Sequence, residues 1–342
     1  PETGTNEWDA NVDIKLPEGN YKAIEKVAPM GYVGEGTVVQ IAAEGNETIE
    51  IRVSNDATNV TFYKFDKDTG KPVVGAAMVL INADGTIVML NEDGYYDPNG
   101  TVEARWVSNV DGFTVRGLPV NGEFALVETA APEGYVYDGE PINFTVGALI
   151  GEQSIQKINE LTEVRIEKVD ALTNERLAGA EFGVYEKGSD ELAKNPVTGE
   201  DLTFTTSAER DEVIYGLTVG GVYELRELTT PAGYIAPLES FSFFVANDAE
   251  DQNVTISNLP TETSVEKLDE KTGEPVAGAT LQIQDMDGNV IEEWTTDGET
   301  HEVYRLNIGQ TYKLVEAAAP EGYSVADPIE FTVDESGMTT VA

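Results

Sequence analysis

Lysine, glutamate and asparagine recur in this sequence at spacings that would allow them to react with one another. Two complete sets occur: Lys64 with Glu128 and Asn159, and Lys168 with Glu227 and Asn258. A desolvated lysine amine is a nucleophile, and a buried carboxyl group can hold and transfer a proton. If that proton polarises the asparagine carbonyl, the amine can attack it and ammonia can leave. The expected product is an internal Lys–Asn amide.

The glutamate lies in a segment that occurs four times without a gap. Each copy begins with Tyr or Phe, has Glu four positions later and ends in Pro-x-Gly-Tyr. The copies span residues 21–32, 124–135, 223–234 and 312–323, and their glutamates are Glu25, Glu128, Glu227 and Glu316. A segment repeated at this period indicates an array of similar modules.

The lysine and the asparagine lie in two further repeated segments. Lys64, Lys168 and Lys267 each precede a Gly-Ala pair by 11 residues, and Asn55, Asn159 and Asn258 each lie 9 residues before the next of these lysines. The order within a module is therefore Lys, Glu, Asn. The predicted divisions are a partial module at 1–57, complete modules at 58–160 and 161–262, and a module without its last strand at 263–342.

The two outer modules are expected to hold incomplete sets. The first has Glu25 and Asn55 but no lysine strand, and the chain opens inside the pattern, as a piece of a longer protein would. The last has Lys267 and Glu316, and by the repeat spacing its asparagine would lie about 24 residues beyond Tyr323, past the end of this sequence. Lys267 and Asn55 are therefore predicted to be unpaired.

Strand alternation predicts that all three residue types face inward. Val164 and Ile166 share a face with Lys168, and Tyr223 and Leu225 share a face with Glu227. Lys157 is an exception, because its parity places it on the same face as Asn159. This predicts a β-bulge in that strand, or a strand that ends early.

Burying these charged side chains would cost free energy if they had no partner and took part in no reaction. A buried unpaired charge costs several kcal/mol or more, and a buried lysine tends to lose its proton. A neutral amide removes that cost, so we expect the cross-link in both complete modules. The alternative is a buried Lys–Glu ion pair, with the asparagine only closing a turn.

Composition excludes several classes of function. The chain has 21 basic and 63 acidic residues and a formal charge of −42, so it repels nucleic acid and anionic membranes. It has no cysteine, which excludes thiol chemistry, and no apolar run long enough for membrane insertion. Frequent Asp-Gly turns indicate an all-β fold of short strands.

These segments resemble the B-type repeat domains of collagen adhesins and of Gram-positive pilin shafts. The resemblance rests on the Lys-x-Asp strand, the Gly-Ala pair, the Glu segment ending in Ala-Pro-x-Gly-Tyr and the strand ending in Asn. It implies tandem transthyretin-like, or prealbumin-like (Ig-like), β-sandwich modules in a rod. It also implies autocatalytic Lys–Asn isopeptide bonds, with the glutamates as catalytic acids.

The resemblance also implies a setting. We expect a structural stalk of a cell-surface adhesin or pilus-like protein, anchored to the cell wall outside a Gram-positive bacterium. The chain would be monomeric and would use no cofactor or metal. Any host matrix protein or glycan would be bound by another part of the parent protein. The sequence has neither a Tyr-Pro-Lys polymerisation motif nor a Leu-Pro-x-Thr-Gly sorting signal.

Other readings of the sequence are weaker. Residues 66–70 and 285–289 faintly resemble calcium loops, but turn chemistry explains them better. The loops at 91–105 and 187–203 could make the chain a ligand-binding module instead of a stalk, although the aromatic loop at 93–100 is expected to be solvated. The carboxylates could suggest a glycosidase, but most are expected on outward positions or turns. Trp106 and Trp294 are expected to pack near the core.

Overall fold

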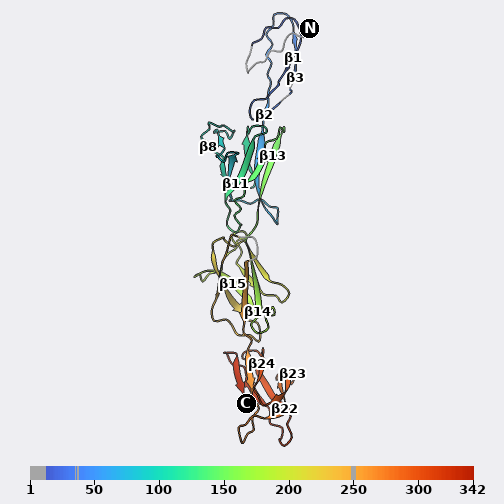
Figure 1. Cartoon of the computed structure of the whole chain (residues 1–342), viewed down its shortest axis with the longest axis vertical. Coiled ribbons are helices and arrows are strands. Elements are labelled where there is room, and N and C mark those ends of the chain that lie inside the picture. Colours follow the sequence, from blue (N-terminus) through green and yellow to red (C-terminus); the bar gives the residue numbers. More distant parts are fainter. Residues whose placement is uncertain (1–12, 35, 37, 248–251) are drawn as a thin grey trace. The chain divides into compact units, whose positions relative to one another are not determined.

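The computed structural model describes residues 13–342 except 35, 37 and 248–251 (Figure 1). Every regular element that it describes is a β-strand. The chain divides into two compact units, one with residues 1–132 and 137–160 and the other with residues 133–136 and 161–342. Below, residues 58–160 are called module A, residues 161–260 module B and residues 261–342 module C.

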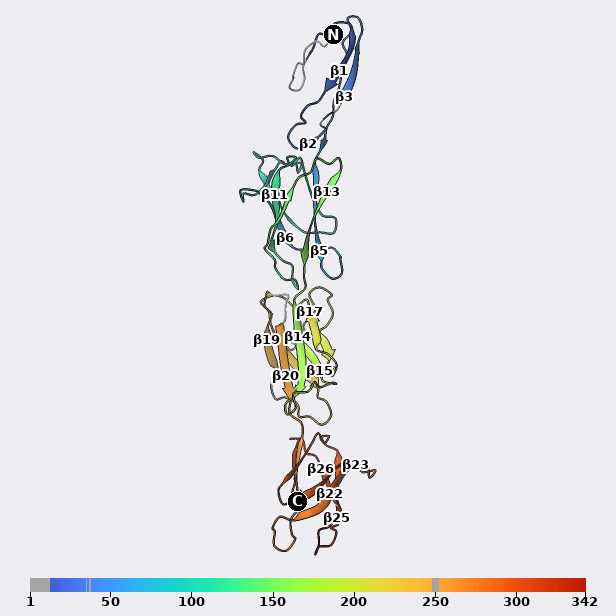
Figure 2. The same ribbon diagram turned by 45° about the vertical axis from the view of Figure 1, so that its right-hand side comes forward.

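Module A is a sandwich of two sheets. One sheet has the order β10 (Phe113–Arg116), β5 (Asn59–Asp66), β13 (Glu152–Asn159), and the other has the order β12 (Ile142–Thr145), β11 (Glu123–Ala130), β6 (Ala77–Asn82), β9 (Arg105–Val107). The first strand, β5, pairs in parallel with the last strand, β13, which Figure 2 shows beside it. The two ends of the module therefore lie on neighbouring strands. A small hairpin of β7 (Met89–Leu90) and β8 (Val102–Glu103) is inserted between β6 and β9.

Module B repeats this plan. Its first sheet has the order β17 (Glu212–Tyr215), β14 (Glu163–Asp170), β20 (Gln252–Asn258), and its second has the order β16 (Thr203–Thr205), β15 (Glu181–Glu186), β18 (Val222–Thr229), β19 (Phe241–Phe244). The first and last strands, β14 and β20, again pair in parallel.

Module C has the same two sheets. The orders are β24 (His301–Tyr304), β21 (Glu262–Val265), β27 (Met338–Val341), and β23 (Val290–Asp297), β22 (Ala277–Gln284), β25 (Thr311–Ala318), β26 (Ile329–Thr332). The expectation that this module lacks its last strand is wrong in part, because β27 supplies the start of that strand and pairs in parallel with β21. The first strand of the module begins at Glu262, one residue before the predicted division.

Alternating side chains give each module its own core. In β14 the residues Val164 and Ile166 are almost fully buried, and in β18 Tyr223 and Leu225 are buried, as their alternation predicts. Three separate clusters of buried apolar residues result, one in each module. Trp106 and Trp294 pack against the clusters of modules A and C, which confirms their expected placement. The all-β sandwich prediction is confirmed.

The segment before module A contains two small pairs of strands. β1 (Gly19–Ile24) pairs with β3 (Val38–Ala43), and β2 (Tyr32–Val33) pairs with β4 (Asp56–Ala57), all antiparallel. Apolar side chains of this segment such as Ile24 and Ile49 are about half exposed. The predicted partial module also includes residues 1–12, which lie outside the described residues.

Candidate functional site: a buried lysine, glutamate and asparagine

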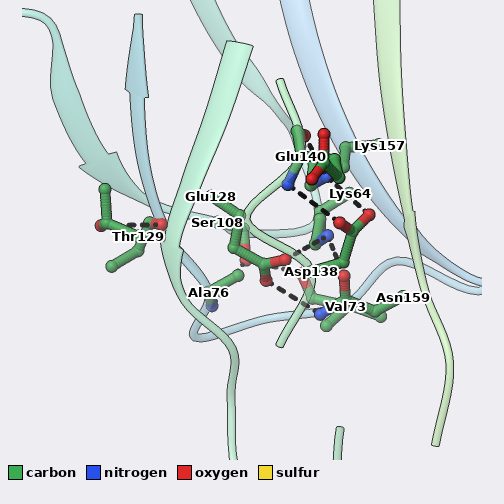
Figure 3. A network of polar contacts seen from close by, with 11 residues as sticks. Lys64, Val73, Ala76, Ser108, Glu128, Thr129, Asp138, Glu140, Lys157 and Asn159 are labelled. Carbon is green, nitrogen blue, oxygen red and sulfur yellow. Dashed lines mark hydrogen bonds and ion pairs between the residues drawn. The ribbon is translucent and has the colours of Figure 1, made fainter. Parts of the chain in front are cut away.

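Module A brings Lys64, Glu128 and Asn159 together inside its core (Figure 3). Lys64 on β5 lies 3.2 Å from Oε2 of Glu128 on β11, and the side chains are 1% and 0% exposed. The Lys64 amine also donates to Oδ1 of Asn159, at the end of β13. Asn159 Nδ2 in turn donates to Glu128 Oε1 at 2.9 Å. The three side chains form a closed ring in which each contacts the other two.

Module B contains the same ring. Lys168 Nζ lies 3.2 Å from Glu227 Oε2 and donates to Asn258 Oδ1, and Asn258 Nδ2 donates to Glu227 Oε1 at 2.7 Å. The Lys168 and Glu227 side chains are 0% and 1% exposed. The ammonium group also lies 5.5 Å from the centre of the Phe182 ring, on the wall of the core.

Parallel pairing explains how the lysine and the asparagine meet. In module A, Asn159 is level with Asp66, two residues beyond Lys64, and in module B, Asn258 is level with Asp170, two residues beyond Lys168. The long lysine side chain spans this offset between adjacent strands. The asparagine backbone is fixed by a hydrogen bond from the residue after Lys-x-Asp: Lys67 N donates to Asn159 O, and Ala171 N to Asn258 O.

A register shift follows the glutamate in each module. In β11 the pairing with β6 shifts between Glu128 and Ala130, and β18 and β25 have equivalent shifts between Glu227 and Thr229 and between Glu316 and Ala318. An irregularity of this kind redirects the neighbouring side chains and ends regular pairing. The glutamate is therefore the last residue of the strand that points regularly into the core.

Burial prepares the lysine amines to react. Burial lowers the pKa of Lys64 to about 8, even though the Glu128 carboxylate favours the charged form. Burial likewise lowers the pKa of Lys168, against the opposing effect of Glu227. The lower pKa raises the fraction of Lys64 side chains that are neutral near pH 7. A neutral amine in contact with an amide is the arrangement that a nucleophilic attack requires.

The asparagine amide presents its nitrogen, not its oxygen, to the glutamate. Glu128 Oε1 accepts from Asn159 Nδ2, and Glu227 Oε1 accepts from Asn258 Nδ2. This differs from the expectation that the glutamate proton polarises the asparagine carbonyl. The carboxylate instead bridges the attacking amine and the leaving nitrogen, which suits it to carry a proton from one to the other.

The two incomplete sets also come together as pairs. In module C, Lys267 Nζ lies 3.8 Å from Glu316 Oε1, and the lysine side chain is 21% exposed. The pairing of β27 with β21 ends at Val265, two residues before Lys267. In the N-terminal segment, Asn55 Nδ2 donates to Glu25 Oε1 at 2.6 Å, which reproduces the Glu–Asn contact of the complete modules. Glu25 Oε2 and Asn55 Oδ1 are buried without a hydrogen-bond partner.

Lys157 departs from its predicted role. The expected bulge or early end is absent, because β13 pairs with β5 without a break from Glu152 to Asn159. Lys157 therefore points into module A, where it is 2% exposed. Its amine donates to Asp138 Oδ2 at 2.9 Å and to the Glu140 carbonyl at 2.8 Å. The half-exposed Asp138, on the connection between β11 and β12, is its acidic partner, and strand parity alone does not predict that partner.

A hydroxyl residue that the sequence analysis missed supports each site. Ser108 Oγ accepts from Ala76 N and donates to Val73 O, and so secures the Gly-Ala segment that follows the lysine strand (Figure 3). Thr206 holds Ala180 and Leu177 in the same way in module B, and Thr296 accepts from Ala279 N in module C. The available signal was a Ser or Thr two residues after an aromatic, Trp106, Phe204 or Trp294.

In the loops considered for calcium or ligand binding, several side chains make hydrogen bonds or packing contacts within their own module. Asp66 and Asp285 accept hydrogen bonds from the backbone of their own turns, as turn formers do. Tyr96, in the insertion expected to be solvated, packs on the module A core with its ring 6.2 Å from that of Phe124. In the loop at 187–203, Asn195 donates to Tyr215 O. Among the described residues there is no group of three potential metal-binding side chains from His, Cys, Asp and Glu.

A comparison with known protein families identifies the family of these modules. The family model described as SpaA, a prealbumin-like fold domain, matches residues 58–160, 162–260 and 261–342. The chain belongs to this family. Its three matches are the three SpaA-type domains that the structure shows as modules A, B and C. The family resemblance expected from the repeated segments is therefore confirmed.

The chain is also similar to solved structures of proteins from several bacteria. The Bacillus anthracis TIE protein is 20% identical, with a TM-score of 0.41, and the match covers 90% of this chain and 54% of that one. BcpA, the major pilin subunit of Bacillus cereus, is 16% identical (TM-score 0.32; 83% and 97% covered). The pilus adhesin SpaC from Lactobacillus rhamnosus GG is 15% identical (TM-score 0.38; 88% and 42% covered). The chain thus spans about half the length of the TIE protein.

No curated protein matches the chain. None of the described residues form a helix long and apolar enough to cross a membrane.

Proposed function

We propose that this chain is a structural stalk segment of a bacterial surface protein, reinforced by one Lys–Asn amide in module A and one in module B. The observation that carries the proposal is the closed Lys–Glu–Asn ring, which has the same atomic contacts in both modules. A simple buried ion pair needs no asparagine in contact with both charged groups.

The reaction follows from the contacts in the ring. The neutral Lys64 amine attacks Cγ of Asn159, and Glu128 Oε2 takes a proton from the attacking nitrogen. Rotation of the protonated Glu128 carboxyl group about its Cγ–Cδ bond brings that proton to Nδ2 of Asn159, and the bond from Cγ to Nδ2 then breaks. One C–N bond forms, another breaks, and one ammonia molecule leaves. Glu128 ends in its starting state.

Burial favours the product. Before the reaction the core contains a lysine whose charged form is disfavoured by burial, and afterwards it contains a neutral amide. The departing ammonia dissolves in water, which makes the step effectively irreversible. The side chains are consumed, so each module reacts once. On this proposal the chain is a self-modifying structural protein and not an enzyme.

The position of the bond would make each module resistant to force. The chain enters module A on β5 and leaves it on β13, and the bond would join Lys64 to Asn159 across these neighbouring strands. A pull along the chain would then pass through covalent bonds alone. The residues between Lys64 and Asn159 would carry no load, whereas unaided strand pairing rests on hydrogen bonds worth about 1 kcal/mol each.

The cellular setting forms part of the proposal. Two proteins of similar structure are a major pilin subunit and a pilus adhesin. Together with the modular fold and the charge of −42, this supports a location on the outside of a Gram-positive bacterium, where the chain would hold other parts of its parent protein away from the cell. Wall anchoring and any host ligand would belong to those other parts.

Peptide mapping tests the chemistry at residue level. After digestion, tandem mass spectrometry should find one branched peptide that joins Lys64 to Asn159 and a second that joins Lys168 to Asn258. Lys168→Arg should abolish the second peptide and leave the first, because each module holds its own ring. Linear peptides alone, with all four residues unmodified, would refute the proposal.

A further inference from the structure

Module A buries a second lysine beside the reacting one. Lys157 on β13 lies level with Lys64 on β5, and both residues are 2% exposed. Two amines at facing positions of adjacent strands cannot both keep an unbalanced charge in a core, because each charged form disfavours the other. The partners of the two amines decide which one loses its proton.

Two oxygen acceptors hold the Lys157 amine in place. It donates to the Asp138 carboxylate and to the Glu140 carbonyl, and the Asp138 side chain is 49% exposed, so that water also solvates it. Burial raises the pKa of Asp138, but hydrogen bonds from the Glu140 N–H and from Lys157 outweigh this and lower it. Asp138 therefore remains a carboxylate, which forms an ion pair with the Lys157 amine at 2.9 Å.

The groups that face Lys64 come from three elements. Glu128 projects from β11, Lys157 from β13, and Asp138 from the connection between β11 and β12, and Figure 3 labels them around the Lys64 amine. Glu128 and Asp138 favour the charged form of Lys64, and Lys157 opposes it. Lys157 is buried at the position level with Lys64, whereas the Asp138 side chain is 49% exposed and is screened by water, so the ion pair as a whole favours the neutral Lys64 amine.

Among the described residues of module B, no second lysine lies level with the reacting one. The residue level with Lys168 is Ile256, a buried apolar side chain. The rings of the two modules are otherwise alike in contacts and burial. The chain therefore contains its own comparison: one ring with a cation beside the nucleophile and one ring without.

We propose that Lys157 is a positioning residue for the cross-link of module A: held by Asp138, its ammonium group keeps the facing Lys64 amine in the neutral, nucleophilic form. This rests on the proposed Lys–Asn reaction. A second cationic group beside a lysine is a known way to activate the amine. Module A should consequently form its bond at lower pH than module B.

The test follows bond formation in both modules at once. The full chain is recovered in urea from inclusion bodies, before it has folded, so that its intact mass equals the sequence mass, and is then diluted into buffers from about pH 5 to 9. Samples are quenched in acid at intervals and digested. The two branched peptides are then counted by mass spectrometry. Because only the neutral amine reacts, the rate in each module should rise with pH to a plateau.

The informative variant is Lys157→Met, which keeps most of the length of the side chain and removes its charge. Module A should then require a higher pH, with a rate near pH 7 about three- to tenfold lower, equivalent to a pKa change of roughly half a unit to one unit. Module B should be unchanged. Lys157→Ile, which copies Ile256 of module B, should give the same result and guards against a packing defect specific to methionine.

The outcomes separate the two proposals. If neither branched peptide forms at any pH, the Lys–Asn reaction itself is wrong. If both form but the pH profile of module A is the same with and without the charge at position 157, Lys157 has no part in the reaction. A mass spectrum in which Lys157 itself is joined to Asp138, with loss of water, would also overturn this assignment.

Discussion

Lys168 Nζ donates a hydrogen bond to Oδ1 of Asn258, 90 residues later in the chain, inside a core where both side chains are almost fully buried. Glu227 contacts both of them, which makes it the residue on which the proposed reaction depends.

Glu227→Ala should prevent the bond in module B and leave the bond in module A intact, because no other carboxylate links the Lys168 amine to Asn258. A cross-link closing a loop of this length stabilises by about 4–5 kcal/mol in the chain-entropy description, so module B should melt on the order of 20 °C lower. Calorimetry and peptide mapping measure the two effects.

Glu224→Ala is the matched control on the same strand. Glu224 lies on the opposite face of β18 and pairs with the partly exposed Arg226, an interaction worth less than about 1 kcal/mol. The branched peptide should form normally in this variant. A normal yield of the Lys168–Asn258 peptide in Glu227→Ala would show that Glu227 is not the proton carrier.

Lys267 should remain a free amine in a protein of residues 1–342. Its pairing partner Glu316 is in place at 3.8 Å, but β27 ends before the level at which the other modules place their asparagine. After denaturation, an amine-reactive reagent should label Lys267 as fully as the exposed Lys271, and should leave Lys64 and Lys168 unlabelled. Failure to label Lys267 would mean that it has found an acceptor that the ring geometry does not predict.

Thr206→Val should destabilise module B by about 1–3 kcal/mol, because the Ala180 N–H and the Leu177 carbonyl would lose their buried hydrogen-bond partner. Urea unfolding followed by hydrogen exchange in β14 and β15 would measure the loss. Thr206→Ser should restore most of the stability, since Ser108 holds the same place in module A. Equal losses for valine and serine would attribute the effect to packing instead.

Asp170 should titrate well below other aspartates. Burial raises its pKa, but hydrogen bonds from Tyr234 and Arg305 outweigh this and bring the pKa to about 2, below the usual 3.8. Its ionised form therefore stabilises the fold above about pH 4, and this contribution is lost as the pH falls through 2. NMR titration of the carboxyl carbon measures the pKa directly.

Arg305→Gly should raise the pKa of Asp170 and move this loss of stability to higher pH. Glycine suits the site, because Arg305 has a φ of 67° where modules A and B have Gly117 and Gly216, also in the left-handed region. The substitution removes the guanidinium without adding backbone strain. An unchanged pKa would assign the low value to Tyr234 and the turn amides alone.

Most of the fold could be predicted from local pattern. Alternation placed Lys168, Glu227 and Asn258 on inward faces, and the repeat spacing gave their order, because strand parity and module length are properties of the chain itself. The parallel pairing of the first and last strands could not be predicted in this way, because it depends on how the whole sandwich folds. It fixes how far Asn159 lies beyond Lys64, a relation between strands that neither strand encodes alone.

The residues that were missed have partners distant in the sequence. The parity of Lys157 predicted a bulge or an early strand end in place of a buried lysine. Its partner Asp138 could not be predicted, because Asp138 lies in an irregular connection to which no periodicity applies. Ser108 acts through a backbone amide 32 residues away, a contact that composition does not show. The start of the last strand at β27 was missed because Met338–Val341 is only four residues long.

The intact mass of the chain tests the central claim most directly, when it is measured under denaturing conditions after the chain has folded. Two Lys–Asn amides lower the mass by two ammonia molecules relative to the sequence, and Glu128→Ala combined with Glu227→Ala should restore the full sequence mass apart from the substitutions. The account predicts a deficit of two ammonia molecules in the unmodified chain. A mass equal to that of the sequence would contradict it.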